Sequence, residues 1–431
     1  MRPPVPLTRR ALGRTGARVA GGGLVLTALT AAACGVPGSA PEPAEATAIE
    51  FWHFWDEEDY QQFEPFLAEF RQRNPKVQVN PVAQAGGGSG MNEKLTAAVV
   101  SDTPPDLATM FPRYLARLIE GNAIVPWEIS AADKKDIYES VQQVFAYRGK
   151  TWAIPIEHSL YGLYWNRKLF REASLSAPPK TLQELVDFGK RIARDTDGDG
   201  KLDQWGFRDD GPTTIFNFYF SNQVRFVSED GKKVLFDSPA MVDVLEFWND
   251  LVRRHRVTDF PMPSRDMWHA DRVGLMIAGS WRLQENVQQG RDFDTARIPK
   301  WKVDATEAAP DCLAILNTTR DKIAASQKLA NWMCSKEVFT TLALKNHYLP
   351  IRKSILESPE YQQYIKQVPQ VKGLIEMIPF EQAKPLHPVW REIEGELGKM
   401  REQVEKGEAT PKAAVTSAAR TAQAIVDQYY A

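Results

Sequence analysis

The segment AIEFWHFWDEEDYQQFEPFLAEFRQRNPKVQV (residues 48–79) switches between the two hydrophobic periods of protein secondary structure. Its first six residues are a short run with isoleucine and aromatic side chains, which predicts a strand. A helix is predicted next, because four apolar residues recur at i, i+3, i+4 and i+7: Phe63, Phe66, Leu67 and Phe70. Asn74-Pro75 ends that helix, and residues 77–79 alternate as a second strand. A strand, a helix and a strand in succession predict an α/β fold.

Short apolar strands and amphipathic helices alternate along the rest of the chain. We predict a mobile glycine loop at 86–90, a hairpin at 147–155 and a strand at 160–166. Thr181 and Glu184 have the spacing of a capping box at the start of a further helix. No internal repeat or long linker interrupts this body, so two lobes would have to be joined by several crossing segments.

The composition and the charge limit the classes of ligand. Of the 431 residues, 43% are hydrophobic and 25% are charged, and the length suggests two or three domain-sized units. Five of the 53 basic residues, and no acidic residue, lie in the first 33 positions. Without that leader, 48 basic residues remain against 55 acidic ones, a net charge of −7. A mildly acidic surface argues against nucleic acid or anionic lipid as the main ligand.

The N-terminus has the features of an export signal. A leader rich in arginine precedes an apolar run at 19–33, which is shorter than the roughly 20 residues of a membrane-spanning helix. Residues 1–33 are therefore predicted to be a signal peptide. The sequence before Cys34 resembles the lipobox of bacterial lipoproteins, with Ala31 where that motif usually has leucine. Cys34 would then be acylated and become the mature N-terminus; the alternative is an ordinary signal peptide with an incidental cysteine.

Export also bears on the segment after the lipid anchor and on the remaining cysteines. Residues 34–47 are rich in Pro, Ala, Gly, Ser and Glu, which predicts a flexible tether. Arg9-Arg10 resembles a twin-arginine signal, so export by either the Sec or the twin-arginine route stays open. In an oxidising compartment Cys312 and Cys334 form an even pair, which predicts a disulfide; two buried free thiols are the alternative.

Residues 195–203 have the spacing of a calcium-binding loop. Carboxylates stand at loop positions 1, 3, 5 and 9, and a backbone carbonyl would serve at position 7: Asp195, Asp197, Asp199, Asp203 and Lys201. The twelfth position is Gly206 rather than a bidentate glutamate, so the loop is not a complete EF-hand. We predict one structural Ca²⁺ here, away from the ligand; a solvated Asp/Gly turn is the alternative.

An ordered set of short motifs covers the chain from residue 48 to the C-terminus. In order they are FWHFW (51–55), PDL (105–107), GKTWAIP (149–155), GLYWNRKLF (162–170), PKTLQEL (179–185), MIAGSW (276–281) and YLPIR (348–352). Together they resemble family 1 of the bacterial extracellular solute-binding proteins, the group that includes maltose-binding protein. Leu182 departs from the pattern, because the family usually has tryptophan there.

The resemblance implies two α/β lobes joined by a hinge of three crossing segments, with a ligand cleft between them. Lobe 1 would comprise residues 48–157 and 302–355, and lobe 2 residues 158–301 and 356–431. Such proteins capture ligand by hinge closure. The implied function is that of a monomeric lipoprotein on the outer face of the cytoplasmic membrane. It would capture a di- or oligosaccharide and deliver it to the permease subunits of an ABC importer.

The resemblance and the strand ends together select candidate ligand-binding residues. The family places stacking aromatic residues where this chain has Trp281 and Trp390. His53 and Trp55 end the first strand, where an α/β sheet presents ligands. Hydrogen bonds to the ligand are expected from six more residues: Asp106, Glu157, His158, Asn217, Tyr219 and Arg352. The alternative in each case is a structural role, such as a core tryptophan, a turn cap or a buried helix at 216–219.

The sequence carries no enzyme signature that we can name. It has no nucleotide-binding glycine motif, no nucleophile elbow and no His-Glu-x-x-His zinc motif. We therefore expect a binding protein rather than an enzyme. An exported carbohydrate-active hydrolase remains an alternative, because paired carboxylates meet only in space. A binding protein for another polar solute, such as a glycerol phosphate, is a further alternative, although no cluster of arginines is evident in the sequence.

Overall fold

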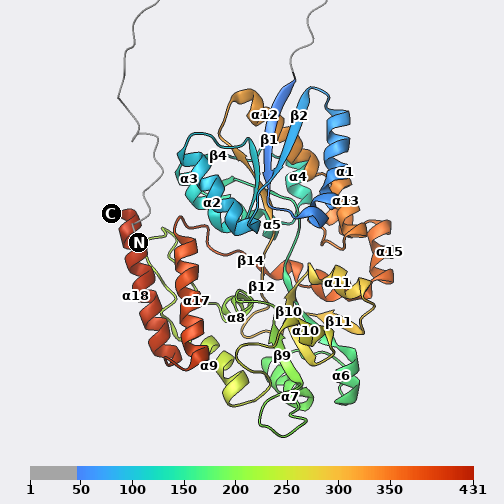
Figure 1. Ribbon diagram of the computed structural model, residues 1–431, viewed down its shortest axis with the longest axis vertical. Coiled ribbons are helices and arrows are strands. Elements are labelled where there is room, and N and C mark those ends of the chain that lie inside the picture. The colour runs from blue at the N-terminus through green and yellow to red at the C-terminus, as the bar shows by residue number, and fades with distance from the viewer. Residues whose placement is uncertain (1–45) are drawn as a thin grey trace, which may run out of the picture.

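The computed structural model describes residues 46–431. The predicted signal peptide at 1–33 and the predicted lipid anchor Cys34 lie outside the described residues, as does most of the predicted tether. Two separate sheets occupy the two halves of the molecule along its long axis (Figure 1). Within the described range no helix combines the length and the apolarity needed to cross a membrane.

The first sheet has the strand order β2-β1-β3-β13-β4, with β7 paired to β13. Its strands are β1 (Thr47–His53), β2 (Val77–Ala83), β3 (Leu107–Met110), β4 (Ile124–Val125), β7 (Ile154–Pro155) and β13 (Cys312–Leu316). β2 and β3 run parallel to β1, whereas β13 runs antiparallel to its neighbours. The predicted first strand and second strand are both confirmed.

Helices flank this sheet, and most of them bury apolar residues. They are α1 (Glu57–Arg73), α2 (Gly87–Val100), α3 (Leu115–Glu120), α4 (Ala131–Asp136), α5 (Glu139–Val144), α12 (Arg320–Met333) and α13 (Lys336–Lys345). The four apolar residues predicted to line one face of α1 are all buried, and Asp56 caps its first turn. The prediction of a glycine loop at 86–90 is wrong in part, because α2 already begins at Gly87.

The second sheet has the order β11-β8-β10-β9. Its strands are β8 (Tyr161–Asn166), β9 (Trp205–Asp209), β10 (Val273–Gly279) and β11 (Phe293–Ala296). Every residue of β10 is buried, as expected for a central strand that is covered on both faces. The helices of this half are α6 (Arg167–Glu172), α7 (Leu182–Ile192), α8 (Phe216–Ser221), α9 (Pro239–Arg253), α10 (Arg265–His269), α11 (Arg282–Gln288), α16 (Lys372–Ile375), α17 (Trp390–Lys406) and α18 (Pro411–Tyr430). The predicted capping box of Thr181 and Glu184 is present at the start of α7.

Several short elements complete the structure. They are β5 (Ala146–Tyr147), β6 (Lys150–Thr151), β12 (Thr306–Glu307), β14 (Glu381–Gln382), α14 (Lys353–Leu356), α15 (Pro359–Gln367), η2 (Pro112–Tyr114), η3 (Pro369–Val371) and η4 (Ile378–Phe380). β5 and β6 pair as the predicted hairpin, with Arg148 and Gly149 at positive φ in its turn. α15 packs against α13, and the chain returns to the second sheet at α16. The lobe boundaries given above remain a prediction.

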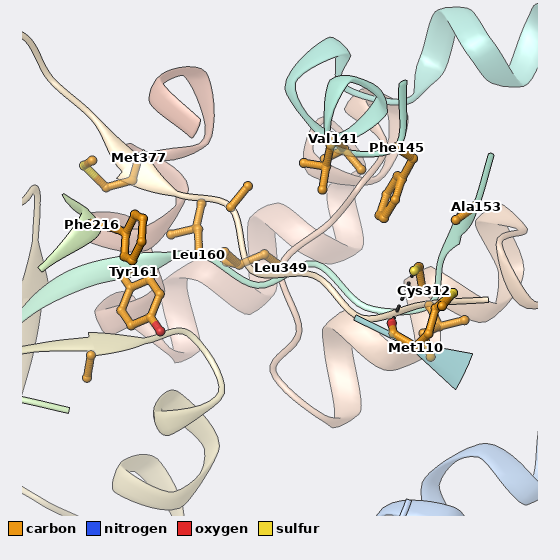
Figure 2. Close-up of a cluster of buried hydrophobic side chains, with 14 of the residues drawn as sticks. Met110, Val141, Phe145, Ala153, Leu160, Tyr161, Phe216, Cys312, Leu349 and Met377 are labelled. Atoms are coloured by element: carbon orange, nitrogen blue, oxygen red, sulfur yellow. Dashed lines mark hydrogen bonds between the residues drawn. The ribbon is translucent and has the colours of Figure 1, made fainter. Parts of the chain in front are cut away.

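The chain passes between the two halves through a buried crossing region. Leu160 on the first crossing forms a β-bridge with Ala308 on the second, and β12 pairs with β14 beside them. The buried His158 joins three segments, because its Nδ1 lies 2.9 Å from the Pro350 carbonyl and its Nε2 lies 2.5 Å from Glu381. Apolar side chains surround this region (Figure 2). The crossings are thus tied into one buried cluster.

The predicted disulfide is wrong. Cys312 on β13 and Cys334 at the end of α12 are both buried and both free. The Cys312 thiol donates instead to the Met110 carbonyl on the neighbouring strand, at 3.2 Å (Figure 2). Burial raises the pKa of both thiols, that of Cys334 to about 12, which keeps them protonated and unreactive. The alternative of two buried free thiols therefore holds.

Candidate ligand-binding site

A cavity of about 520 Å³ lies between the two sheets. Segments that follow β1, β3, β9 and β10 reach it, so it sits beyond the carboxyl ends of strands, where α/β sheets present ligands. Residues of the crossing region close its floor. Its lining comprises Phe54, Trp55, Asp59, Phe111, Pro112, Arg113, Val144, Glu157, Tyr161, Thr213, Trp281, Glu307, Ala308, Ala309, Pro310, Asp311, Tyr348, Lys384, Pro385 and Leu386.

Six of these lining residues are aromatic, and Trp281 is the most exposed of them. Its side chain follows β10 and is 39% exposed, while its ring meets Tyr161 edge-on at 5.3 Å between centroids. Gly279 makes this position possible, because a Cβ there would lie 2.2 Å from the Trp281 ring. On the opposite side Trp55 stacks on Phe63 of α1 at 4.1 Å, which fixes the plane of its indole. The cavity therefore offers flat apolar faces held by the core.

Three carboxyl groups stand close together on the floor and on the first-sheet side. Glu157 accepts hydrogen bonds from Ser159 Oγ at 2.9 Å and from Tyr348. Burial nevertheless outweighs these bonds and raises the pKa of Glu157 to about 7. Burial, together with the charges of Glu157 and Asp59, raises the pKa of Asp311 well above its ordinary value. The pKa of Asp59 is also raised, by burial and by the neighbouring acids of α1.

A second acidic group lies on the crossing side and carries its own counter-ion. Lys384 Nζ lies 2.7 Å from Glu307 and 2.6 Å from Glu394. Burial lowers the pKa of Lys384, but the two carboxylates outweigh it and raise the pKa overall, so the lysine stays charged. Arg113 is the other cation of the cavity. It stacks on Phe111 at 4.5 Å and on Tyr114 at 5.2 Å, and it forms no ion pair with the residues that the structure describes.

A smaller cavity of about 310 Å³ shares Arg113 and Thr213 with the first. Its wall includes Tyr219 and the face of α17 that carries Gly395 and Gly398. A Cβ at either glycine would meet nothing within 4 Å, so the helix surface is open there. The two cavities therefore adjoin at Arg113 and Thr213.

Comparison with known proteins agrees with this geometry. Residues 66–369, more than half of the chain, match the family described as bacterial extracellular solute-binding protein. The chain belongs to this family.

Curated relatives of this solute-binding protein have low sequence identity, and two of them match most of the chain. A putative binding protein of Brucella abortus (strain 2308) is 21% identical over 380 residues, which covers 84% of this chain and 89% of the relative. The maltotriose-binding protein of Pyrococcus abyssi is 20% identical over 374 residues, with 81% and 76% covered. The sn-glycerol-3-phosphate-binding periplasmic protein of Salmonella typhimurium is 27% identical over 156 residues, only 34% of this chain and 35% of that protein.

Solved structures show the same fold. The cyclic alpha-maltosyl-1,6-maltose binding protein from Arthrobacter globiformis superposes with a TM-score of 0.76 at 19% identity, covering 89% of this chain and all of that one. The sugar-binding protein MalE from Xanthomonas citri gives 0.77 at 18% identity, with 89% and 98% covered. The predicted two-lobed α/β fold of the periplasmic binding proteins is thereby confirmed.

The solute-binding protein brings three of the predicted ligand residues to the main cavity and a fourth to the smaller one. Trp281, Trp55 and Glu157 line the cavity of 520 Å³, and Tyr219 lines its neighbour. Whether these four contact a ligand remains a prediction.

Trp390 and His53 were expected in the cleft, but they belong to the core. Trp390 is fully buried and packs edge-on against Phe226 at 5.4 Å, because the first turn of α17 faces inward. His53 is 4% exposed and stacks on Tyr60 at 4.9 Å. In both cases a neighbouring aromatic ring packs against the side chain that we expected to face the ligand.

Three predicted polar residues also lie outside the cavities and have structural partners. Asp106 is buried and accepts from Glu50 N, Thr318 Oγ1 and Lys322 Nζ at 2.9–3.0 Å, which ties β1 to α12. His158 joins the crossing segments, as described above. Asn217 accepts from the backbone nitrogen of Glu307 at 2.8 Å, so it positions a cavity residue without reaching the cavity.

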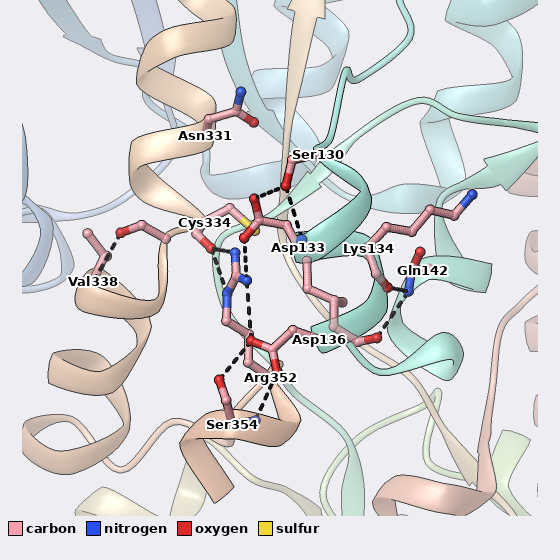
Figure 3. A network of polar contacts seen from close by, with 12 residues as sticks. Ser130, Asp133, Lys134, Asp136, Gln142, Asn331, Cys334, Val338, Arg352 and Ser354 are labelled. Atoms are coloured by element: carbon pink, nitrogen blue, oxygen red, sulfur yellow. Dashed lines mark hydrogen bonds and ion pairs between the residues drawn. The ribbon is translucent and has the colours of Figure 1, made fainter. Parts of the chain in front are cut away.

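Arg352 is part of a separate polar network (Figure 3). Its guanidinium donates to the Cys334 carbonyl at 2.7 Å and to Asp133 at 2.6 Å, and Asp136 lies 3.5 Å away. The side chain is 5% exposed. Arg352 therefore fastens α4 to the end of α12 and, contrary to the expectation of a ligand contact, lines neither cavity.

The sequence analysis missed several cavity residues: Asp59, Phe111, Arg113, Thr213, Glu307, Asp311, Tyr348 and Lys384. Most lie in turns just after strands or in the crossing region, where no periodicity marks them. Tyr348 belongs to the YLPIR motif, and this was the one sequence signal that pointed to it.

The loop at 195–203 lies between α7 and the start of β9, at the opposite end of that strand from the cavity. Carboxylate oxygens of Asp195, Asp197 and Asp203 come within 4.8 Å of one another, but Asp199 is not part of this group. Asp195 accepts from the nitrogens of Gly198 at 2.7 Å and Gly200 at 2.9 Å. The loop is thus folded by its own hydrogen bonds, and bound calcium remains a prediction.

Proposed function

We propose that this protein captures a small carbohydrate, a di- or oligosaccharide, for an ABC importer. The cavity between the two sheets carries this proposal, because it pairs aromatic faces with carboxyl and guanidinium groups. A sugar ring presents apolar C–H faces and hydroxyl edges, and a site for it needs flat apolar walls and a few directed polar groups. Relatives named as maltotriose-binding and cyclic maltosyl-maltose-binding proteins support the assignment.

Hinge closure would complete the site. Tyr161 lies in β8 and Trp281 follows β10 of the second sheet, whereas the other three residues follow strands of the first sheet: Trp55, Phe111 and Glu157. A ligand that touches both sets binds the closed arrangement better than the open one, so it shifts the population toward closure. The importer would then recognise the closed protein. Export by the N-terminal signal and anchoring through Cys34 complete this proposal.

A glycerol phosphate is a weaker second candidate. It is favoured by partial relatives named for that ligand, which cover no more than 43% of this chain. Four carboxylates line the main cavity, however, and Arg113 is its one cation that has no acidic partner among the described residues. A phosphate dianion would face net repulsion there, so a neutral polyol or sugar fits better.

The protein is proposed to bind its sugar without hydrolysing it. Glu157, with its pKa raised to about 7, has the protonation behaviour of a general acid, and Asp311 lies in the same cavity. The family consists of binding proteins, and we propose that bound sugar is released unchanged. Chromatography after prolonged incubation with the best ligand tests this, and released monosaccharide would contradict it.

Replacement of Trp281 tests the site directly. Isothermal titration of the mature protein against maltose, maltotriose, cellobiose and glycerol 3-phosphate identifies the best ligand. We expect Trp281→Ala to lower the affinity for that ligand by about tenfold to a hundredfold, because a stacking face is lost. Trp281→Phe retains a smaller face and should lose less. Trp301→Ala, which removes an indole packed on Phe247 outside the cavity, serves as the control. Unchanged affinity in Trp281→Ala would refute the assignment.

A further inference from the structure

The charge of the main cavity is unbalanced. Its lining contains four carboxyl groups and two cations: Asp59, Glu157, Glu307 and Asp311 against Arg113 and Lys384. Lys384 is already shared between Glu307 and Glu394. Arg113 alone is left to face the other three carboxyl groups.

A buried acceptor in the same wall has no donor. Glu307 Oε1 lies 2.7 Å from Lys384, but Oε2 is buried and has no hydrogen-bond partner among the described residues. The side chain is only 5% exposed. Its backbone is fixed by Asn217, whose amide oxygen accepts from the Glu307 nitrogen at 2.8 Å. An unpartnered carboxylate oxygen held in this way needs a donor from outside the protein chain.

The carboxyl groups of Glu157 and Asp311 lack a neighbouring positive charge that would offset their burial. Burial raises the pKa of both, and their mutual repulsion adds to the effect at Asp311. A positive charge among them would relieve that repulsion and favour their ionised forms.

The spacing and the walls define what kind of cation fits. Among the described residues, carboxylate oxygens close enough to share one small metal ion occur in the 195–203 loop and not in the cavity. The cavity acids line a space of about 520 Å³ that six aromatic residues also line. Aromatic faces attract organic cations, and an ammonium group offers three donors to several acceptors at once.

We infer that the cavity prefers a saccharide that carries a protonated amino group over its neutral hydroxyl or N-acetyl counterpart. The inference rests on the proposed function, since it names the class of sugar that the same site selects. The ring stacks on the aromatic walls, as any sugar would. The ammonium group supplies the donor that Glu307 lacks within the protein, and a positive charge that offsets Glu157 and Asp311.

The test compares sugars that differ only in the substituent at carbon 2, which is a hydroxyl, an N-acetyl or an amino group. The probes are cellobiose, chitobiose and fully deacetylated chitobiose, with maltose and its 2-amino-2-deoxy derivative as an α-linked pair. Titration calorimetry of the mature protein at low ionic strength should give at least about tenfold tighter binding for the amine of each set. The advantage should shrink as salt is added, because it is electrostatic.

Two isosteric variants show where the preference arises. In Glu157→Gln and Asp311→Asn the amine advantage should fall to about threefold or less, while the neutral sugars bind at least as well as before. Glu402→Gln, which removes an exposed carboxylate of α17 paired only with Lys406, changes the net charge equally and should keep the full advantage. Unfolding curves confirm that each variant is folded.

The outcomes separate this inference from the proposed function. Neutral sugars that bind as tightly as their amines would overturn the preference and leave sugar capture intact. An amine advantage that survives in both cavity variants would also overturn it. If no saccharide of either kind binds, the proposed function fails as well.

Discussion

The acidic side chains of the main cavity and those of the loop at 195–203 are satisfied in different ways. In the loop, the carboxylates of Asp195, Asp197, Asp199 and Asp203 accept backbone N–H groups from the loop itself. The Thr196 hydroxyl, followed by the Thr196 backbone N–H, lowers the pKa of Asp203. In the cavity, burial raises the pKa of Glu157 and Asp311, and Glu307 keeps an oxygen without a partner.

The difference teaches that clustered acids in a sequence have two physical meanings. A tight Asp/Gly loop brings carboxylates to its own amide groups, so the acids stabilise a turn. Acids that arrive from distant elements have no such local donors. They destabilise the free protein and are held in place by the surrounding packing, which is the usual condition of a binding site.

The largest effect expected from this contrast is a loss of stability between acidic and neutral pH. The folded-state pKa of Glu157 is about 7 against an ordinary value of 4.5, so the unfolded chain loses that proton first. Stability should therefore fall as pH rises from about 4.5 to about 7 and stay low above it, by up to about 3 kcal/mol. Glu157→Gln should remove this loss and unfold later than the wild type at pH 8. Urea unfolding at pH 5 and pH 8 measures it, and an unchanged pH slope in the variant would contradict the account.

A smaller effect of opposite sign is expected in the loop. Asp195→Ala removes the acceptor for Gly198 and Gly200, so it should destabilise the protein, by about 1 kcal/mol or less because the loop is exposed. Sugar affinity should not change, since the loop lies at the far end of β9. Denaturant unfolding and calorimetry measure the two quantities side by side. A loss of affinity would show that the two regions are coupled.

The smallest effect concerns calcium. If the loop binds Ca²⁺ with the modest affinity expected of an incomplete shell, 1 mM Ca²⁺ should raise the melting temperature by about 1–2 °C over EDTA. Asp197→Asn should abolish the shift, because Asp197 belongs to the group of three close carboxylates and caps fewer backbone amides than Asp195. No shift in the wild type would leave the loop as a hydrogen-bonded turn.

Local patterns made most of the fold predictable. The apolar spacing in α1, the capping box of α7 and the hairpin of β5 and β6 depend on residues close in sequence, so the sequence alone indicates them. The site depends on contacts between distant segments. Glu157 follows β7 and Asp311 precedes β13, and only the pairing of those two strands brings them together.

The two tryptophans predicted to stack on the ligand also show that the local sequence does not determine which residues reach the site. Trp281 directly precedes α11 and Trp390 begins α17, yet the first is 39% exposed and the second is fully buried. The outcome was decided by neighbours: Gly279 leaves room for the first indole beside the cavity, whereas Phe216 and Phe226 enclose the second. No local signal in either segment encodes that choice.

The exposure of Trp281 has a practical consequence. The sequence contains 12 tryptophans, all within the described range, and Trp281 is the one that is largely open to water. Emission from an indole depends on its contact with water, so a molecule that covers this ring would change the intrinsic fluorescence. The protein thus carries a built-in optical reporter at the mouth of its cavity, and capture can be followed in real time without a label.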